Sequence, residues 1–169
     1  MSSETADAPE QIEKGQALPE AQLTIMGDDG PQTITSRELC GHGTSVIFAV
    51  PGAFTPTCSA QHLPGFVENA QAFFDKDVDR LVCVAVNDVF VMDAWAKQGH
   101  VDNKIIMAAD GNGDFSRALG LEMDATAFGM GHRCQRFALI VQDGMVENVF
   151  IEGPGEFRVS SAEYVLNQL

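Results

Sequence analysis

Three short apolar runs constrain the fold of this chain more than any other feature. Residues 44–50 (TSVIFAV), 79–86 (DRLVCVAV) and 104–110 (KIIMAAD) have the length of strands and no regular polar alternation. Such runs are typical of strands that are buried on both faces of a sheet. A helical pattern or a short helix follows each run, so we expect parallel strands joined by crossover helices.

After this alternation the chain turns to hairpins and a final helix. RFALIVQ (136–142) and MVENVFI (145–151) flank Asp143-Gly144, a strong hairpin signal. A shorter hairpin is expected earlier, in QLTIMGDDGPQTI, and a last helix should begin at Ser160, which has capping-box spacing with Glu163. The order of elements predicts an α/β fold, a thioredoxin-like sandwich whose central mixed sheet is flanked by helices.

Length and composition indicate one globular domain. The chain has 169 residues, of which 45% are hydrophobic, enough for a core of its own. Residues 1–15 are acidic and lack periodicity, so we expect a disordered tail followed by a domain at 16–169. No membrane span or secretory signal is recognisable, which makes a cytoplasmic protein the default expectation. The net charge of −14 argues against binding to nucleic acid.

Cys58 stands where a helix should begin, just after the first buried strand. The N–H groups and the dipole of a helix N-terminus favour a thiolate, the nucleophilic form of cysteine. Thr55 can direct its hydroxyl to the same space, while Pro51 and Pro56 stiffen the loop and shield the sulfur. Pro64 lacks an N–H group, so the first turn should be kinked and easily unwound. A buried, inert thiol is the usual fate of a lone cysteine, but this combination favours a reactive one.

These residues carry a family resemblance. PGAFTPTCSAQHLPGF contains Pro51-x-x-x-Thr55-x-x-Cys58, which resembles the active-site motif of peroxiredoxins, and its wider form resembles the type II, or atypical two-cysteine, subfamily. The blocks VNDVFVMDAW, RFALIVQDGMV and GEFRVSSAEYVLNQL are similar to plant and bacterial members in the same order. The similarity runs from about residue 15 to the end of the chain.

The resemblance implies a thiol-dependent peroxidase that reduces hydrogen peroxide and alkyl hydroperoxides. Cys58 would be the peroxidatic cysteine and would become a sulfenic acid. Thr55 would orient the peroxide, Pro51 would shield the site, and Arg136 would be the catalytic arginine. For Arg133 we favour a solvated surface charge. The class implies no metal or organic cofactor, and family members form homodimers through loops near the active site.

The sequence leaves open how the sulfenic acid is reduced. The animal branch has a resolving cysteine near the C-terminus, and EFRVSSAEY contains none. Cys83 matches the second cysteine of plant members, but its apolar strand slightly favours a packing role. The competing route is direct reduction by glutaredoxin with glutathione, or by thioredoxin. Cys134 lies close to two arginines, which would favour glutathionylation, although we prefer a neutral loop role. Cys40 should pack beneath a short helix.

Other signals are weaker. Cys58 and His62 have metal-ligand spacing, but no second pair accompanies them, so we expect His62 to pack near the active-site helix. DGNGDF (110–115) begins like a calcium loop without its required glycine, and a capped turn is expected instead. Phe90, Met92 and Trp95 should form a core-facing stripe. The rival function is a non-catalytic redox sensor that signals through oxidised Cys58, and repeated peroxide turnover distinguishes the peroxidase from it.

Overall fold

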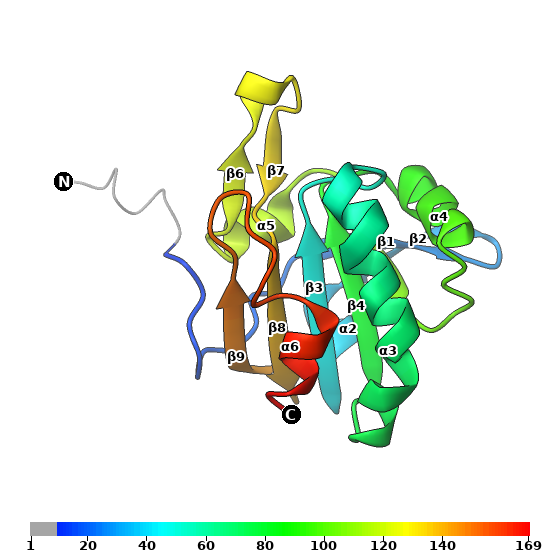
Figure 1. Cartoon of the computed structure of the whole chain (residues 1–169), viewed down its shortest axis with the longest axis vertical. Helices are drawn as coiled ribbons and strands as arrows, with labels where there is room; N and C mark the ends of the chain where they lie inside the picture. The colour runs from blue at the N-terminus through cyan, green and yellow to red at the C-terminus, as the bar shows by residue number, and fades with distance from the viewer. Residues whose placement is uncertain (1–9) are drawn as a thin grey trace.

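The computed structural model describes residues 10–169 and contains a seven-stranded mixed sheet (Figure 1). The strand order is β2-β1-β5-β4-β3-β8-β9. The three apolar runs form the adjacent parallel strands β3, β4 and β5, and β8 lies antiparallel to β3. The bounds are β1 Gln22–Gly27, β2 Gly30–Thr35, β3 Thr44–Val50, β4 Arg80–Ala85, β5 Ile106–Ala109, β8 Phe137–Gln142 and β9 Met145–Ile151. The predicted mixed sheet is confirmed.

Helices cover both faces of this sheet. One core cluster joins α3, α4 and α6 to the sheet, and in Figure 1 α3 and α6 lie in front of the strands. A second cluster joins α2 and α5 to the opposite face. The bounds are α2 Ser36–Cys40, η1 Cys58–His62, α3 Leu63–Asp75, α4 Val89–Gln98, α5 Asp114–Ala118, η2 Thr126–Phe128 and α6 Ala162–Leu166. None of these helices is long and apolar enough to span a bilayer.

Local capping explains where several helices begin. Thr35 and Glu38 form a capping box at the start of α2. Asp88 accepts a hydrogen bond from the N–H of Val91 at the start of α4. The prediction for α6 was wrong by one residue, because Ser161 is its cap. Ser160 is fully buried, and its hydroxyl donates to the carboxylate of Glu152. It therefore does not cap the helix.

The domain begins earlier than the sequence indicated. Ile12 is only 5% exposed, and its N–H group donates to the carbonyl of Leu119 at 2.8 Å. The N–H of Gly15 donates to the carbonyl of Val146. Residues 10–15 therefore lie against the domain, since Ile12 and Leu18 add to the core of the second face. The expected tail is corrected at these positions, and residues 1–9 lie outside the described residues.

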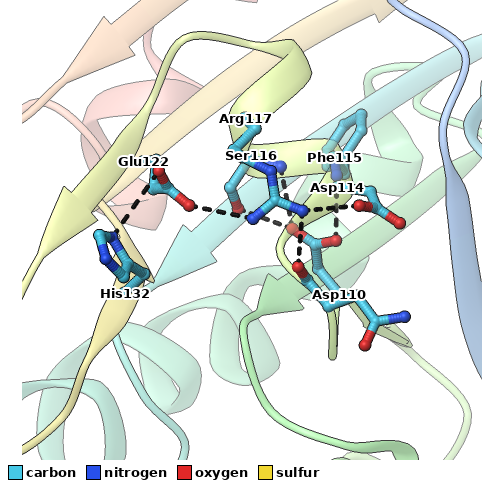
Figure 2. Close-up of polar contacts among 8 residues, drawn as sticks. Asp110, Asp114, Phe115, Ser116, Arg117, Glu122 and His132 are labelled. Carbon is cyan, nitrogen blue, oxygen red and sulfur yellow. Dashed lines mark hydrogen bonds and ion pairs between the residues drawn. The ribbon is translucent and has the colours of Figure 1, made fainter.

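A short hairpin was not predicted. Strands β6 (Glu122–Asp124) and β7 (His132–Cys134) form a two-stranded sheet that projects from the body of the domain (Figure 1). Figure 2 shows Arg117 of α5 between Asp114 and Glu122, and His132 beyond Glu122. Three-residue strands that carry charged side chains give no period-2 apolar signal.

Strand register brings distant residues to one edge of the sheet. Ala49 of β3 is opposite Phe137 of β8, and Phe137 is in turn opposite Ile151 of β9. The next position beyond each strand therefore places Arg136 beside the end of β3 and beside Glu152. The N–H of Glu152 donates to the carbonyl of Arg136 at 3.0 Å, which extends this ladder. The loop that carries Cys58 leaves from the same edge.

Candidate active site

Cys58 begins a π-helical segment, Cys58–His62, which continues directly into α3. The N–H of Leu63 bonds to the carbonyl of Cys58, five residues earlier rather than four. Because Pro64 has no N–H to offer, the hydrogen-bond ladder before it cannot keep the α-helical pattern. The segment is a π-turn, a feature that is frequent at functional sites, whereas the expected kink and easy unwinding stay predictions.

The Cys58 sulfur is held by an arginine. Nη2 of Arg136 donates to Cys58 Sγ at 3.2 Å, and Cys58 has no exposed surface. Because the arginine guanidinium is a cation, a positive charge faces this buried sulfur. The structure thus brings together the two residues on which the predicted chemistry depends. It places the thiol deeper than the predicted helix mouth suggested.

His62 holds the other side of the guanidinium. Arg136 Nη1 lies 2.9 Å from His62 Nδ1, and His62 Nε2 lies 2.9 Å from the carbonyl oxygen of Ser160. Since an arginine can only donate, Nδ1 must accept, and the imidazole proton must sit on Nε2 and point to Ser160. Burial, and then the charge of Arg136, lower the pKa of His62 to about 3. The ring is therefore a neutral acceptor for Arg136.

Aromatic rings enclose this histidine. The ring centroids of Phe48 and Phe157 each lie 5.0 Å from that of His62. The Phe157 ring also lies under the Arg136 guanidinium, with 5.9 Å between the guanidinium carbon and the ring centroid. These contacts place aromatic side chains against both His62 and the Arg136 guanidinium.

Thr55 and Pro51 lie on the loop before Cys58. The Thr55 hydroxyl donates to the carbonyl of Gly52 at 2.7 Å, and the N–H of Ser59 donates to the Thr55 carbonyl. Within residues 10–169 no hydrogen bond joins the Thr55 hydroxyl to the Cys58 sulfur, which differs from the simplest expectation. The bond to Gly52 instead orients the hydroxyl, so that its lone pairs stay available as acceptors. Pro51 is half-buried at the end of β3.

The other cysteines are buried. Cys83 points from β4 into the same core cluster as Cys58, and burial raises its thiol pKa well above the usual range. Cys134 donates its S–H to the carbonyl of Val50 at 3.1 Å. Burial raises the pKa of Cys134 to about 12. The idea of a glutathionylated Cys134 is therefore wrong, because neither exposure nor thiolate character is present.

Two further expectations are corrected. Arg133 is not a solvated surface charge: it is half-buried, and it donates to the carbonyls of Met130 and Val86 at 2.8 and 3.1 Å. It therefore ties the β6–β7 hairpin to the end of β4. The apolar stripe on α4 also divides, since Met92 and Trp95 are buried whereas Phe90 is 64% exposed.

Sequence reasoning missed the residues behind Arg136. His62 was read as a packing residue, although its position one turn after Cys58 was a usable signal. Glu152 and Phe157 gave no signal, and Ser160 was read only as a helix cap, because an acid after a strand and a serine before a helix are common on surfaces. Their roles depend on the register of β8 and β9 and on the path of the loop that follows.

The chain is similar to known proteins over almost its whole length. The Redoxin family model matches residues 13–166. The chain is 41% identical to Peroxiredoxin-2B of Arabidopsis thaliana, over 94% of this chain and 98% of that protein. It is 45% identical to the chloroplastic Peroxiredoxin-2E-2 of rice, over 94% of this chain and 72% of that one. A crystal structure of reduced Prx3 from Vibrio vulnificus with hydrogen peroxide is 45% identical and superposes with a TM-score of 0.89, covering 94% of this chain and 99% of that one.

Proposed function

The chain belongs to the redoxin family and is a peroxiredoxin, a thiol-dependent peroxidase, and from this premise we propose that Cys58 is the sulfur that reduces the hydroperoxide. The observation that carries the proposal is the 3.2 Å hydrogen bond from Arg136 to the buried Cys58 sulfur. Membership in an enzyme family favours the peroxidase over the non-catalytic sensor. Peroxiredoxins act on hydroperoxides and use a thiol as reductant.

In the proposed reaction the Cys58 thiol first releases its proton to water. A sulfur lone pair then forms a bond to the terminal oxygen of the hydroperoxide, and the O–O bond breaks. The sulfur is oxidised to sulfenic acid, and the departing alkoxide takes a proton from water and leaves as an alcohol, or as water when the substrate is hydrogen peroxide. We propose hydrogen peroxide and small alkyl hydroperoxides as substrates, in line with the peroxide bound by the Vibrio vulnificus relative.

Arg136 and Thr55 would act on the peroxide rather than on the sulfur alone. Raising the thiolate fraction has a limited effect, because nucleophilicity falls as the thiol becomes more acidic. A larger gain comes from donors aimed at the oxygen on which charge develops. Within the described residues Arg136 uses two of its five N–H groups, on Cys58 and His62, so others remain for an oxygen. The Thr55 hydroxyl, oriented by Gly52, would accept the peroxide O–H.

Pro51 would close the outer side of the pocket and exclude water. Because Cys58 has no exposed surface, peroxide must enter through movement of the segment that begins at Pro51. The π-turn at Cys58–His62 supports such movement, since π-turns are frequent at functional sites and Pro64 offers no N–H group to the turn before it. The same movement would later expose the sulfenic acid to a reducing thiol.

For regeneration we propose direct attack by an external thiol. The thiol sulfur displaces the sulfenic oxygen as water and forms a mixed disulfide with Cys58, and a second thiol then releases Cys58 in its reduced form. Glutathione with glutaredoxin, or thioredoxin, would supply these thiols in the cytoplasm, the location that we propose. Cys83 is a poor resolving residue, because a thiol with a raised pKa forms little thiolate.

A homodimer is also proposed, since many peroxiredoxins are dimers. Phe54, Phe90 and Phe128 are 46%, 64% and 82% exposed, and aromatic side chains are enriched in protein interfaces. Analytical ultracentrifugation of the wild type and of Phe90→Ser would test this assembly. A monomeric wild-type protein would contradict it.

Steady-state turnover of hydrogen peroxide with each reductant system tests the catalytic proposal. We expect Cys58→Ser to lose turnover completely. We expect Cys83→Ser to keep it within about twofold of the wild type with glutaredoxin and glutathione, since no step uses Cys83. Residual peroxidase activity in Cys58→Ser would refute the role of Cys58. A 58–83 disulfide in the oxidised wild type, seen by mass spectrometry, would refute the external route.

A further inference from the structure

Glu152 is a buried carboxylate at the end of β9, and it lies outside the proposed chemistry. It is 7% exposed. Its Oε2 atom accepts three hydrogen bonds, from the N–H of Arg158 at 2.7 Å, the N–H of Ser160 at 2.8 Å and the hydroxyl of Ser160 at 2.7 Å. A buried charge with three donors on one oxygen holds its partners firmly. Here those partners belong to the loop between β9 and α6.

The loop held by Glu152 reaches the active site through two contacts. The Ser160 carbonyl accepts the Nε2 proton of His62, and the Phe157 ring packs on both His62 and Arg136. His62 in turn accepts from Arg136, which donates to the Cys58 sulfur. A continuous chain of hydrogen bonds and packing thus runs from a carboxylate to the sulfur.

The direction of each bond in this chain is fixed. Oε2 of Glu152 accepts in all three of its bonds, so the donors of Ser160 turn toward it and anchor that residue. The Ser160 carbonyl fixes the His62 proton on Nε2, which leaves Nδ1 as an acceptor for Arg136. If Ser160 moved, His62 could adopt the other tautomer, and an N–H on Nδ1 would then face the N–H of the guanidinium and repel it. Anchoring Ser160 therefore keeps Arg136 aimed at the sulfur.

We propose that Glu152 is a positioning residue for the peroxidase reaction, acting on Arg136 through Ser160 and His62. This inference rests on the roles proposed above for Cys58 and Arg136. The Glu152 carboxylate forms no hydrogen bond with the side chain of Cys58 or of Arg136 within the described residues. Its contribution is geometric: it holds the loop so that the guanidinium has one orientation when peroxide arrives.

The main test is the rate constant for oxidation of Cys58 by hydrogen peroxide, measured in competition with a heme peroxidase. Glu152→Gln keeps the shape of the side chain and removes its charge. We expect it to lower the rate constant by about tenfold, because hydrogen bonds to a charged group are lost or weakened. Glu156→Gln is the matched control, since it makes the same change on an exposed carboxylate of the same loop. It should react within about twofold of the wild type.

A double-mutant cycle separates positioning from simple destabilisation. If Glu152 acts through His62, then Glu152→Gln should have little further effect on the rate in a His62→Phe background. Effects that multiply would overturn the proposal, and so would a Glu152→Gln variant that reacts at the wild-type rate. Ser160→Ala, which removes only the hydroxyl, provides a milder variant should Glu152→Gln fold poorly. It should lower the rate by a smaller factor in the same non-additive way.

Nitrogen NMR of the His62 ring gives a readout that does not depend on activity. The wild type should show the Nε2–H tautomer, and Glu152→Gln should show a mixture of tautomers or loss of the slowly exchanging Nε2 proton. An unchanged His62 signal in Glu152→Gln would overturn the proposal even if activity fell. Failure of the proposed catalytic roles would appear separately, as a wild-type rate in Arg136→Ala.

Discussion

Arg136 and Arg117 are the centres of two polar networks, and the two differ in what surrounds the charge. Arg117 is 46% exposed and donates to Asp114 and Glu122 at 2.7 and 3.1 Å (Figure 2). Arg136 is half-buried, and among residues 10–169 it forms no ion pair with a carboxylate. Its partners are a neutral histidine and a thiol.

The difference explains what each network can do. The charge of Arg117 is balanced by two acids and screened by water, so it ties a hairpin to a helix and little more. The charge of Arg136 has no acid to balance it, and the low polarity of its surroundings strengthens its field at Cys58. The carboxylate of Glu152, the nearby buried acid, bonds to the loop rather than to the guanidinium of Arg136. The carboxylate thus fixes geometry and leaves the arginine charge to the sulfur.

The largest expected effect is a loss of unfolding free energy in acid, because His62 in the buried network has a lowered pKa. His62 has a pKa of about 3 in the folded chain, against 6.5 when unfolded. Between these two pH values His62 binds a proton in the unfolded chain but not in the folded chain. The unfolding free energy therefore falls as pH drops below 6.5. The loss is about 3 kcal/mol at pH 4 and nothing above pH 7.

Chemical denaturation of the wild type and of His62→Gln across this range measures the effect as a difference. The comparison is needed because burial raises the pKa of Asp110, and that carboxyl changes stability in the opposite direction as pH falls. His132→Gln, in the exposed network, is the control of the same residue type. Parallel pH profiles for the wild type and His62→Gln would contradict the assignment of a neutral His62.

Replacing the two arginines compares the networks directly. Arg136→Ala should lower kcat/KM for hydrogen peroxide by about a hundredfold, because a donor aimed at developing charge is lost. Arg136→Lys should recover part of this loss, since lysine keeps the positive charge but lacks the planar set of N–H donors of the guanidinium. Arg117→Ala should leave kcat/KM unchanged. Steady-state kinetics with one reductant system measures all three, and equal losses for Arg136→Ala and Arg117→Ala would remove the distinction between the networks.

Thr55 tests whether the pocket needs more than the buried arginine. Thr55→Val keeps the shape of the side chain and removes the hydroxyl that Gly52 orients. We expect kcat/KM to fall by at least about tenfold, because the peroxide loses its acceptor. Thr57→Val is the matched control two residues along the same segment, and it should behave as the wild type does. A normal rate in Thr55→Val would exclude the hydroxyl from catalysis.

The smallest effect is expected in the exposed network. Arg117→Ala should lower the unfolding free energy by no more than about 1 kcal/mol, and less in high salt, because exposed ion pairs are screened. Urea denaturation at low and high salt measures this change. A loss of several kcal/mol that does not respond to salt would show that the exposed network supports the fold far more than its surroundings indicate.

The sequence predicted the sheet well because its signals are local. Continuous apolar runs specified β3, β4 and β5, and Asp143-Gly144 specified the last hairpin. The β6–β7 hairpin was missed because its strands are three residues long and polar. The start of the domain was misplaced because one buried side chain, Ile12, anchors a segment that is otherwise polar.

The site could be predicted only where residues are close in sequence or belong to a family motif. The motif gave Pro51, Thr55 and Cys58, and resemblance added Arg136. The network behind Arg136 joins residues up to 98 positions apart, as His62 and Ser160 are. Such contacts depend on strand register and on a loop path, and neither leaves a pattern in the local sequence.

The most direct test of the account compares two reactions of Cys58 in the native protein, with hydrogen peroxide and with iodoacetamide, each followed by mass spectrometry at that residue. Iodoacetamide reports access to the sulfur, whereas peroxide also reports the donors around it. We predict that peroxide oxidises Cys58 at least about a hundredfold faster than it oxidises free cysteine, while iodoacetamide reacts no faster with Cys58 than with free cysteine. Rates at or below those of free cysteine for both reagents would contradict the claim that Arg136 and its network make this sulfur a peroxidase.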